Sequence, residues 1–251
     1  MILATIQARM GSTRLPGKVL ADVTGTPMIG LQVARLRRSA LIDEILVATS
    51  VSELDDPLVE YCERSGVQVF RGSENDVLSR VSDATLPFEE AVHVECFGDS
   101  PLIDPQIIDL AIKAFKQVRH EVEVVTNTLT TSYPPGMETS IYSVEALQDL
   151  NQKVAPEDPL REHVGFNFTR FEEKFRVRNL LAPDHQNYPD LYLEVDTPID
   201  LEVVREICSH FNEIGAGINF GIDEIIQFAL KNPRVLEKNL LVERRWRKFR
   251  S

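Results

Sequence analysis

Strand-like and helix-like segments alternate along the first half of this chain. Short apolar runs rich in Val and Ile are each followed by a segment with the spacing of an amphipathic helix. Such alternation predicts an α/β fold with a mostly parallel central sheet flanked by helices. The expected strands cover residues 1–6, 44–50, 67–70, 91–97 and 121–127, and the expected helices cover residues 27–36, 56–66, 75–84 and 104–117.

Polar residues stand where several of these helices should begin. Thr26, Asp56 and Asp104 are expected N-caps, because their side chains can accept hydrogen bonds from free backbone amides of the first turn. Pro27 and Pro105 follow two of them, at the helix position where proline is tolerated best. Gly66 is expected to end the second helix.

The regular alternation ends after Thr126. A polar, proline-bearing loop covers residues 128–140, and a short strand (140–143) and a helix from Val144 follow. Residues 159–171 look helical, residues 174–181 and 191–195 look like strands, and Thr197 caps a further helix. Because composition does not change along the chain, we expect one domain over residues 1–251, with an irregular elaboration at about 128–190. This elaboration is larger than a sheet connection needs and is a candidate dimer arm, so a homodimer is expected.

Charge and composition exclude several kinds of protein. The 251 residues carry a net charge of −12, which argues against general nucleic-acid binding. Three widely spaced cysteines lack metal-site spacing and indicate a reducing compartment. Neither a signal peptide nor a membrane-spanning run is apparent, so we expect a cytoplasmic protein without a membrane partner. The basic segment 243–250 is expected to be a solvated tail or a partner contact.

A basic loop follows the first strand. "IQARMGSTRLPGKVL" (6–20) contains Arg9, Arg14 and Lys18 and no acidic residue. It is not a P-loop, because five residues separate its two glycines and Val19 stands where a metal-binding hydroxyl is required. Backbone amides with Arg and Lys can neutralise a polyphosphate, so the loop is a candidate phosphate site. From composition alone, an ordinary solvated basic loop remains an equal alternative.

Two aspartates stand at expected strand ends. Asp99 follows the fourth strand, and Asp196 follows the expected strand 191–195. In open α/β sheets, ligands bind beyond the carboxyl ends of the strands. Two carboxylates facing a phosphate loop make a suitable Mg²⁺ site, because magnesium takes one or two carboxylates together with substrate phosphates. Taken singly, each aspartate is more readily explained as a turn or capping residue, and only together with the basic loop do the two favour a metal site.

The chain also resembles a known family. "ARMGSTRLPGKVL" is similar to the N-terminal signature of the sugar cytidylyltransferases, which include the CMP-KDO synthetases. "SENDVLSRV", "GDSPLIDP", "YPPGMETSIYSVEAL", "REHV" and "VDTPIDLEVV" resemble, in the same order, the spore coat polysaccharide biosynthesis branch of that family. The resemblance implies a nucleotide-diphospho-sugar transferase fold of the glycosyltransferase-A type. It also implies Mg²⁺-dependent transfer of CMP from CTP to an acidic sugar, with release of pyrophosphate.

The resemblance assigns roles only to residues that match its motifs. Arg14, Lys18 and Asp99 are the expected catalytic residues, and Asp99 and Asp196 are the expected metal ligands. The nucleotide is expected to contact Gln7, Ala8, Arg9, Gly11, Ser12, Thr13, Arg14, Lys18 and Asp99, and the sugar Tyr133, Glu138, Arg161, Glu162 and His163. The chain departs from the family pattern at Gln7, Glu95 and Phe97, which leaves the identity of the sugar open.

Two other functions fit the same fold. A glycosyltransferase would normally show an Asp-x-Asp pair at the end of the fourth strand, but here Ser100 and Pro101 follow Asp99. A non-catalytic protein that binds sugar nucleotides would have no need to keep the set of Arg14, Lys18, Asp99 and Asp196. That set therefore favours an enzyme.

Overall fold

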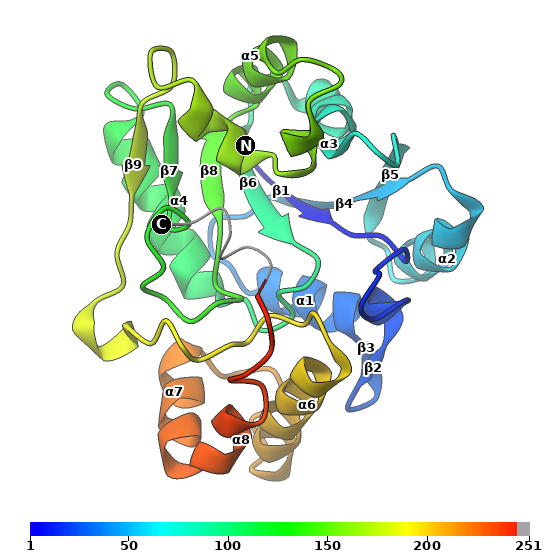
Figure 1. The fold of residues 1–251 in the computed structure, drawn as a ribbon, viewed down its shortest axis with the longest axis vertical. Coiled ribbons are helices and arrows are strands. Elements are labelled where there is room, and N and C mark those ends of the chain that lie inside the picture. The colour runs from blue at the N-terminus through cyan, green and yellow to red at the C-terminus, as the bar shows by residue number, and fades with distance from the viewer. Residues whose placement is uncertain (245–251) are drawn as a thin grey trace.

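The computed structural model describes residues 1–244 and is organised around a mixed sheet (Figure 1). Its seven strands in this part of the chain run in the order β5-β4-β1-β6-β8-β7-β9. They are β1 (Ile2–Gln7), β4 (Glu44–Ser50), β5 (Gln68–Gly72), β6 (Val92–Phe97), β7 (Val124–Thr126), β8 (Ser140–Ser143) and β9 (Val177–Asn179). A small hairpin of β2 (Asp22–Val23) and β3 (Thr26–Pro27) lies apart from this sheet.

Strand direction and strand order together locate the point where a ligand is expected. Within the seven-stranded sheet, every strand pair is parallel except those made by β8, which runs antiparallel to both β6 and β7. The chain adds β4 and β5 on one side of β1 and then crosses to add β6 on the other. The order therefore reverses between β1 and β6, and such a switch point leaves a crevice beyond the carboxyl ends of the two strands.

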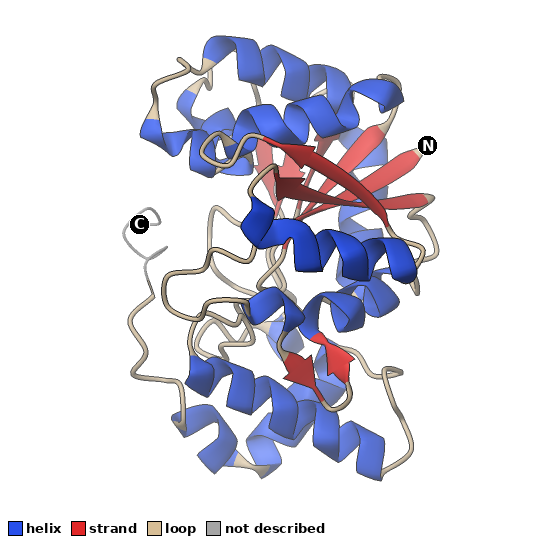
Figure 2. Ribbon diagram, turned by 90° about the vertical axis from the view of Figure 1, so that its right-hand side faces the viewer, coloured by secondary structure: helices blue, strands red, loops and turns tan. Residues whose placement is uncertain are grey.

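Helices cover both faces of the sheet (Figure 2). The longer helices are α1 (Met28–Leu36), α2 (Asp56–Arg64), α3 (Val77–Thr85), α4 (Pro105–Val118), α5 (Val144–Lys153), α6 (Pro198–Glu213) and α7 (Ile222–Lys231), followed by the short α8 (Pro233–Glu237). Single 3-10 turns are η1 (Lys18–Leu20), η2 (Glu53–Asp55), η3 (Leu86–Phe88), η4 (Pro159–Glu162), η5 (Gly165–Arg170) and η6 (Asp184–Gln186).

Two hydrophobic cores lie on opposite faces of the sheet. Ala4 and Ile6 of β1 point into the larger core, which contains residues of α1, α2, α4, α6 and α7. Leu3, between them in the sequence, points into the smaller core, formed with α3, α5 and the aromatic residues Phe168 and Phe175. Because successive side chains alternate between faces and both faces are covered, β1 reads as a continuous apolar run rather than an alternating one.

The strand–helix alternation expected for the first half is present, but two of the expected N-cap residues differ from those in the structure. Asp104 caps α4, its side chain accepting from the amide of Gln106 at 2.7 Å. The expected caps Thr26 and Asp56 are wrong. Thr26 belongs to β3, and Asp56 is already the first residue of α2, which is preceded by Asp55.

The second half departs further from expectation. Residues 159–171 form the 3-10 turns η4 and η5 rather than an α-helix. The expected strand 174–181 is shortened to β9, and α7 and α8 were not anticipated. The segment 128–190 supplies β8, α5 and β9, so much of it is built into the sheet and the smaller core.

The expected strand 191–195 is absent. These residues are extended, but the amides of Leu193 and Val195 donate to the carbonyls of Pro135 (2.7 Å) and Asp99 (2.8 Å) rather than to a neighbouring strand. Gly136 allows this contact, since a Cβ there would lie 2.8 Å from the Glu194 nitrogen. The segment therefore connects the loop 128–139 to the end of β6, and it carries Asp196 to that point.

No helix within residues 1–244 is long and apolar enough to cross a membrane. Of the basic segment 243–250, only residues 243 and 244 are described, and residues 245–250 lie outside the described part. Arg244 is buried, so the expected solvated tail is wrong at this residue.

Candidate active site

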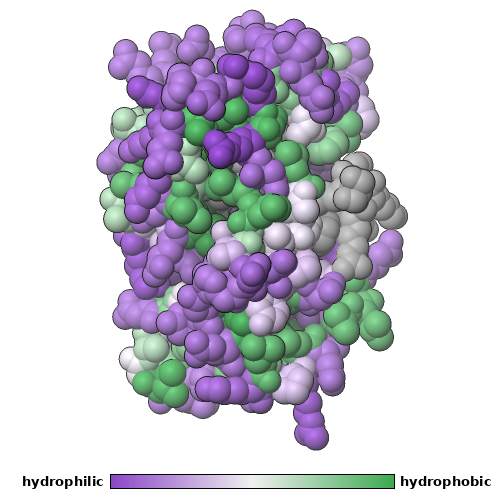
Figure 3. Space-filling model, turned by 90° about the vertical axis from the view of Figure 1, so that its left-hand side faces the viewer, coloured by the Kyte–Doolittle hydropathy of each residue, from purple (hydrophilic) through white to green (hydrophobic). Residues whose placement is uncertain are grey.

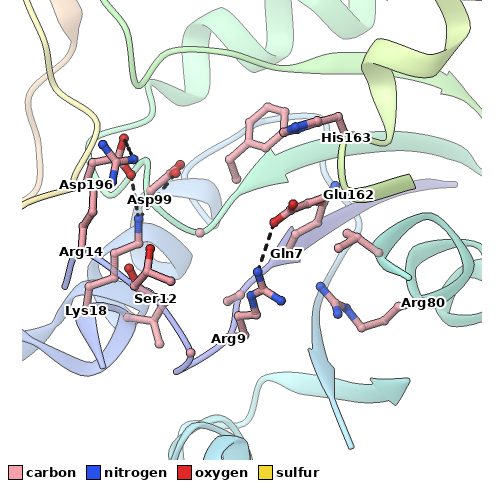
Figure 4. Close-up of a pocket in the computed structure, with 17 residues that line it drawn as sticks. Gln7, Arg9, Ser12, Arg14, Lys18, Arg80, Asp99, Glu162, His163 and Asp196 are labelled. Atoms are coloured by element: carbon pink, nitrogen blue, oxygen red, sulfur yellow. Dashed lines mark hydrogen bonds and ion pairs between the residues drawn. The ribbon is translucent and has the colours of Figure 1, made fainter. Parts of the chain in front are cut away.

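A cavity of about 500 Å³ opens at the switch point between β1 and β6 (Figure 4). Its walls come from the basic loop after β1, the turn after β6, the start of α3, η4 and the residue that precedes Thr197. The lining residues are Gln7, Ala8, Arg9, Gly11, Ser12, Thr13, Arg14, Lys18, Val19, Val77, Arg80, Phe97, Gly98, Asp99, Glu162, His163 and Asp196. Segments far apart in sequence thus meet at the position that the sheet topology indicates.

Gly98 lets the ends of β1 and β6 approach each other. Its amide donates to the Gln7 carbonyl at 3.0 Å, and a Cβ at this position would lie only 2.6 Å from the same oxygen. Any other residue would push the two strand ends apart. Asp99, the next residue, is therefore held at the mouth of the crevice.

The basic loop is anchored by a buried carboxylate that the sequence did not reveal. Asp55 accepts from the Met10 amide at 2.7 Å and also from Thr49 and Ser50 on the end of β4. Burial alone would raise the Asp55 pKa, but these hydrogen bonds outweigh burial and lower it. The carboxylate is therefore ionised at neutral pH and ties the loop to the sheet.

Arg14, Lys18, Asp99 and Asp196 gather at one end of the cavity, which we call the phosphate end (Figure 4). Arg14 pairs with Asp196 at 2.6 Å, and the Lys18 amine lies 3.3 Å from Asp196 and 3.7 Å from Asp99. The same amine donates to the Val195 carbonyl at 2.6 Å. Four charged side chains are thus fixed by one another and by the backbone.

The opposite end carries a different set of charges. Arg9 turns away from the other cations of its loop and pairs with Glu162 at 3.1 Å, and His163 lies next to this pair (Figure 4). Burial lowers the His163 pKa, so the ring is neutral at pH 7. Arg80 of α3 reaches this end from the wall and is held by the Ser73 carbonyl at 2.7 Å. We call this region the Glu162 end.

The structure brings together in this cavity all nine residues that the sequence assigns to the nucleotide, together with Asp196. Of the five expected sugar contacts, only Glu162 and His163 line it. The other three, Tyr133, Glu138 and Arg161, are placed elsewhere.

Arg161 is used inside the protein. It is 5% exposed, pairs with Asp76 at 2.7 Å and donates to Asn151 and to the Val154 carbonyl at 2.7 Å. Tyr133 is buried and lines a separate cavity beside Asp104, and Glu138 accepts from the Gly136 amide at 2.6 Å. In this structure none of the three is positioned to contact a sugar in the main cavity.

Arg80 is the charged lining residue that the sequence did not assign to the site. It lies within "SENDVLSRV", a segment that carried the resemblance, but the helical spacing alone makes it an ordinary residue of α3. Burial lowers its pKa, as does the neighbouring charge of Arg9, while Asp55, Asp76 and Glu162 oppose the change. A buried cation behind the Glu162 end adds positive potential there.

Two buried ionisable residues lie on the face of β6 beneath the cavity. Glu95 accepts from Gln7 at 2.9 Å, from the Tyr142 hydroxyl at 3.2 Å and from the Gly165 amide at 3.3 Å. Burial raises its pKa to about 7 despite these hydrogen bonds. His93 accepts or donates a 2.7 Å hydrogen bond with Thr5, and burial lowers its pKa to about 3. Glu95 thus supports Gln7 and the backbone beyond His163.

The donor set at the phosphate end suits magnesium better than a softer metal. No group of three or more His, Cys, Asp or Glu side chains in residues 1–244 is arranged as a complete metal site. Asp99 and Asp196 nevertheless converge on a single cation, the Lys18 amine. Two carboxylates open to a ligand cavity fit Mg²⁺, which fills its remaining positions with water and phosphate oxygens.

Comparison with known proteins agrees with this geometry. Residues 3–241 match the family model described as cytidylyltransferase. The chain is 33% identical over 236 residues to the spore coat polysaccharide biosynthesis protein SpsF of Bacillus subtilis, covering 92% of this chain and 95% of that protein. It is 32% identical to the 3-deoxy-manno-octulosonate cytidylyltransferase of Mesorhizobium japonicum, covering 83% and 99% of the two chains.

Solved structures show the same fold. A cytidylyltransferase from Leptospira borgpetersenii superposes with a TM-score of 0.87 at 30% identity, over 97% of this chain and 99% of that chain. CMP:2-keto-3-deoxy-manno-octonic acid synthetase, solved in complex with CTP, gives a TM-score of 0.63 at 19% identity, over 83% and 98%. Fold and sequence matches together define a nucleotidyltransferase of the nucleotide-diphospho-sugar transferase fold. The chain belongs to the cytidylyltransferase family.

Proposed function

We propose that this protein transfers CMP from CTP to an acidic sugar and releases pyrophosphate. The observation that carries the proposal is the meeting of Arg14, Lys18, Asp99 and Asp196 at one end of a cavity at the switch point. Two cations and two carboxylates there suit a triphosphate with its metal ion. The names of the relatives support cytidine as the base and a sugar acid as the acceptor.

The reaction needs positioning and charge neutralisation more than a covalent intermediate. An oxygen of the sugar forms a bond to the α-phosphorus while the bond from that phosphorus to the oxygen shared with the β-phosphate breaks. Pyrophosphate leaves with the additional negative charge, and Arg14 and Lys18 are placed to stabilise it. The hydroxyl proton passes to a base, and His163 offers a neutral imidazole at the other end of the cavity.

Magnesium belongs to the proposal as the cofactor. Asp99 and Asp196 would hold it, and when bound it would neutralise phosphate charge and orient the triphosphate. Lys18 pairs with both carboxylates and Arg14 pairs with Asp196, so a metal–triphosphate complex would compete with these ion pairs for the two aspartates.

The Glu162 end is the proposed sugar site. Arg9 and the buried Arg80 provide positive charge there, which an acidic acceptor requires. Glu162 and His163 offer groups that can hydrogen-bond with sugar hydroxyls. The name of the spore coat relative supports a role in surface polysaccharide biosynthesis.

Pyrophosphate release with CTP, Mg²⁺ and a panel of acidic and neutral sugars tests the proposal. We expect release with CTP and at least one acidic sugar, and none with neutral sugars or with excess chelator. Release with ATP, GTP or UTP at equal rates would contradict the assignment of the base. Sugar transfer from a ready-made nucleotide sugar, without pyrophosphate, would instead show a glycosyltransferase.

A homodimer is also part of the proposal. Leu129 and Leu181 of the segment 128–190 are among the large apolar side chains exposed in residues 1–244. Figure 3 views the molecule from the left-hand side of Figure 1, where β9 lies, and shows hydrophobic surface across the middle of this face. Light scattering at micromolar concentration is expected to give twice the mass of one chain, and the mass of a single chain would contradict the dimer.

A further inference from the structure

A buried arginine from the end of the described chain lies behind the phosphate end. Arg244 is 3% exposed and donates to Asp200 at 2.8 Å. It also lies 3.5 Å from Glu194 and stacks over the ring of Tyr192 at 4.3 Å. Burying a guanidinium is costly unless partners compensate for the lost water. Two carboxylates and an aromatic face offset part of this cost, while Nε and Nη1 of Arg244 have no hydrogen-bond partner among the described residues.

Asp200 connects this arginine to the backbone that carries Asp196. One Asp200 oxygen accepts from Arg244 and from Asn239 at 2.9 Å. The other oxygen accepts from the amides of Asp196 at 3.1 Å and Thr197 at 2.8 Å. A helix-capping box needs only the contacts with Thr197. The Asp196 amide and the two partners from the chain end go beyond what helix capping requires.

The same chain end reaches the other member of the ion pair. Arg14 donates to the carbonyl of Glu243, the neighbour of Arg244, at 3.3 Å. Asp196 and Arg14, which pair with each other at 2.6 Å, are thus both contacted through residues 239–244, one through Asp200 and one directly. Arg244 lies beyond residue 241, where the match to the family model ends.

We propose that Arg244, acting through Asp200, is a positioning residue that holds Asp196 and Arg14 in register for the triphosphate. The two carboxylates of the phosphate end have different supports: Asp99 is set by the close approach at Gly98, whereas Asp196 follows a segment without strand pairing. The contacts from the chain end replace the support that a strand would provide. The role in triphosphate positioning rests on the proposed function, and the contacts themselves do not.

Hydrogen exchange tests the support without reference to any substrate. The amides of Asp196 and Thr197 should exchange faster by about tenfold or more in Arg244→Ala than in the wild type, since local opening controls exchange. Leu150→Ala is the matched control, because Leu150 is buried in the smaller core on the other face of the sheet. It should lower the melting temperature without changing exchange at residues 196 and 197. Unchanged exchange in Arg244→Ala would overturn the proposal, whatever the substrate proves to be.

Steady-state kinetics tests the consequence for catalysis. Below its melting transition, Arg244→Ala should lose about 30-fold in kcat/KM for CTP, since small misplacements of reacting groups have effects of this order. Leu150→Ala should stay within about threefold of wild type, because its cavity lies away from the site. Equal losses in the two variants would reduce Arg244 to a stability role and overturn the proposal. If the wild type is inactive but Arg244→Ala still speeds exchange at residues 196 and 197, the proposed function is contradicted and the structural support is not.

A double variant tests whether Arg244 and Asp200 act as one connected unit or have independent effects. If Arg244 acts through Asp200, the variant Arg244→Ala/Asp200→Asn should lose no more kcat/KM than the worse single variant. Losses that multiply would show separate roles and overturn the link. If Arg244→Ala does not fold, Arg244→Lys provides the same measurements. Lysine keeps the charge but lacks the planar group that contacts Asp200 and Glu194 together.

Discussion

The two ends of the cavity are built in different ways. At the phosphate end, Asp196 lies 2.6 Å from Arg14 and 3.3 Å from Lys18, and Lys18 is also held by a backbone carbonyl. At the Glu162 end, the cavity is lined by an ion pair between Arg9 and Glu162, whose side chains are 36% and 56% exposed. One end is fixed by several contacts, and the other depends on a pair open to water.

This difference matches the different demands on the two ends. Under the proposed function, the triphosphate and its metal would be the same in every cycle, so fixed charges can be preorganised for them. Of the two relatives compared above, the name of one states its acceptor, 3-deoxy-manno-octulosonate, and the name of the spore coat protein states none. An exposed pair between the loop after β1 and the 3-10 turn η4 can change without disturbing the sheet, so we expect acceptor specificity to reside at the Glu162 end.

Removing the Asp99 charge should have the largest effect on activity. Asp99→Asn keeps the size of the side chain but weakens the pair that converges on Lys18. We expect a loss of pyrophosphate release of at least about a hundredfold, or about 3 kcal/mol, the usual size for an electrostatic stabiliser of a transition state. The melting temperature should stay close to that of wild type, because the Asp99 side chain is 35% exposed at the mouth of the cavity.

Asp104→Asn is the control for this experiment. Asp104 is buried and accepts from Gln106 at 2.7 Å and from the Ile222 amide at 2.6 Å, so it joins two helix starts and does not line the main cavity. This variant should melt at a lower temperature yet keep most of its activity. An active Asp99→Asn enzyme at ordinary magnesium concentrations would contradict the mechanism.

Arg161→Met should affect stability rather than sugar binding. The substitution leaves Asp76 without its partner at 2.7 Å. Breaking a buried pair in this way typically costs about 3 kcal/mol, and thermal unfolding should show it clearly. The KM for the sugar should change by less than about threefold, because Arg161 does not line the cavity. A large rise in that KM with an unchanged melting temperature would restore the expectation from sequence.

The fate of Arg161 shows what the sequence could and could not predict. The Asp99 motif was readable because a strand, a close-packed glycine and an aspartate are consecutive residues. Asp196 was found although its expected strand is absent, because its role depends on the local DTP motif rather than on strand pairing. Asp76 lies 85 residues from Arg161, and Asp55 lies 45 residues from Met10. Partners at such separations are set by tertiary packing, which no local pattern encodes.

The pH dependence of stability should show whether Glu95, the buried carboxyl group beneath the cavity, is protonated in the folded protein. Glu95 has a pKa raised from 4.5 to about 7, so between these values the folded protein holds a proton that the unfolded chain has lost. Its contribution to stability is therefore present below pH 4.5 and is lost as pH rises toward and through 7. Between pH 5 and pH 8, Glu95→Gln should gain about 2 to 3 kcal/mol relative to wild type.

Chemical denaturation of both proteins at the two pH values measures this difference. The opposite contribution of His93, whose lowered pKa favours the fold above pH 6.5, is present in both proteins and cancels in the comparison. An equal difference between the proteins at both pH values would show that Glu95 keeps an ordinary pKa in the fold.

The smallest expected effect concerns Glu162 itself. An exposed ion pair contributes about 1 kcal/mol or less, so Glu162→Gln should leave the melting temperature nearly unchanged. The substitution removes a negative charge beside an acidic acceptor and frees Arg9 from its partner at 3.1 Å. The KM for an acidic sugar should therefore fall by about threefold, since an exposed ion pair is worth about 1 kcal/mol or less. The KM for CTP should change less. Arg9→Gln is the counterpart and should raise the sugar KM. A rise in sugar KM on Glu162→Gln would contradict this prediction and would mean that hydrogen bonds from the carboxylate to sugar hydroxyls outweigh its repulsion of the acidic group.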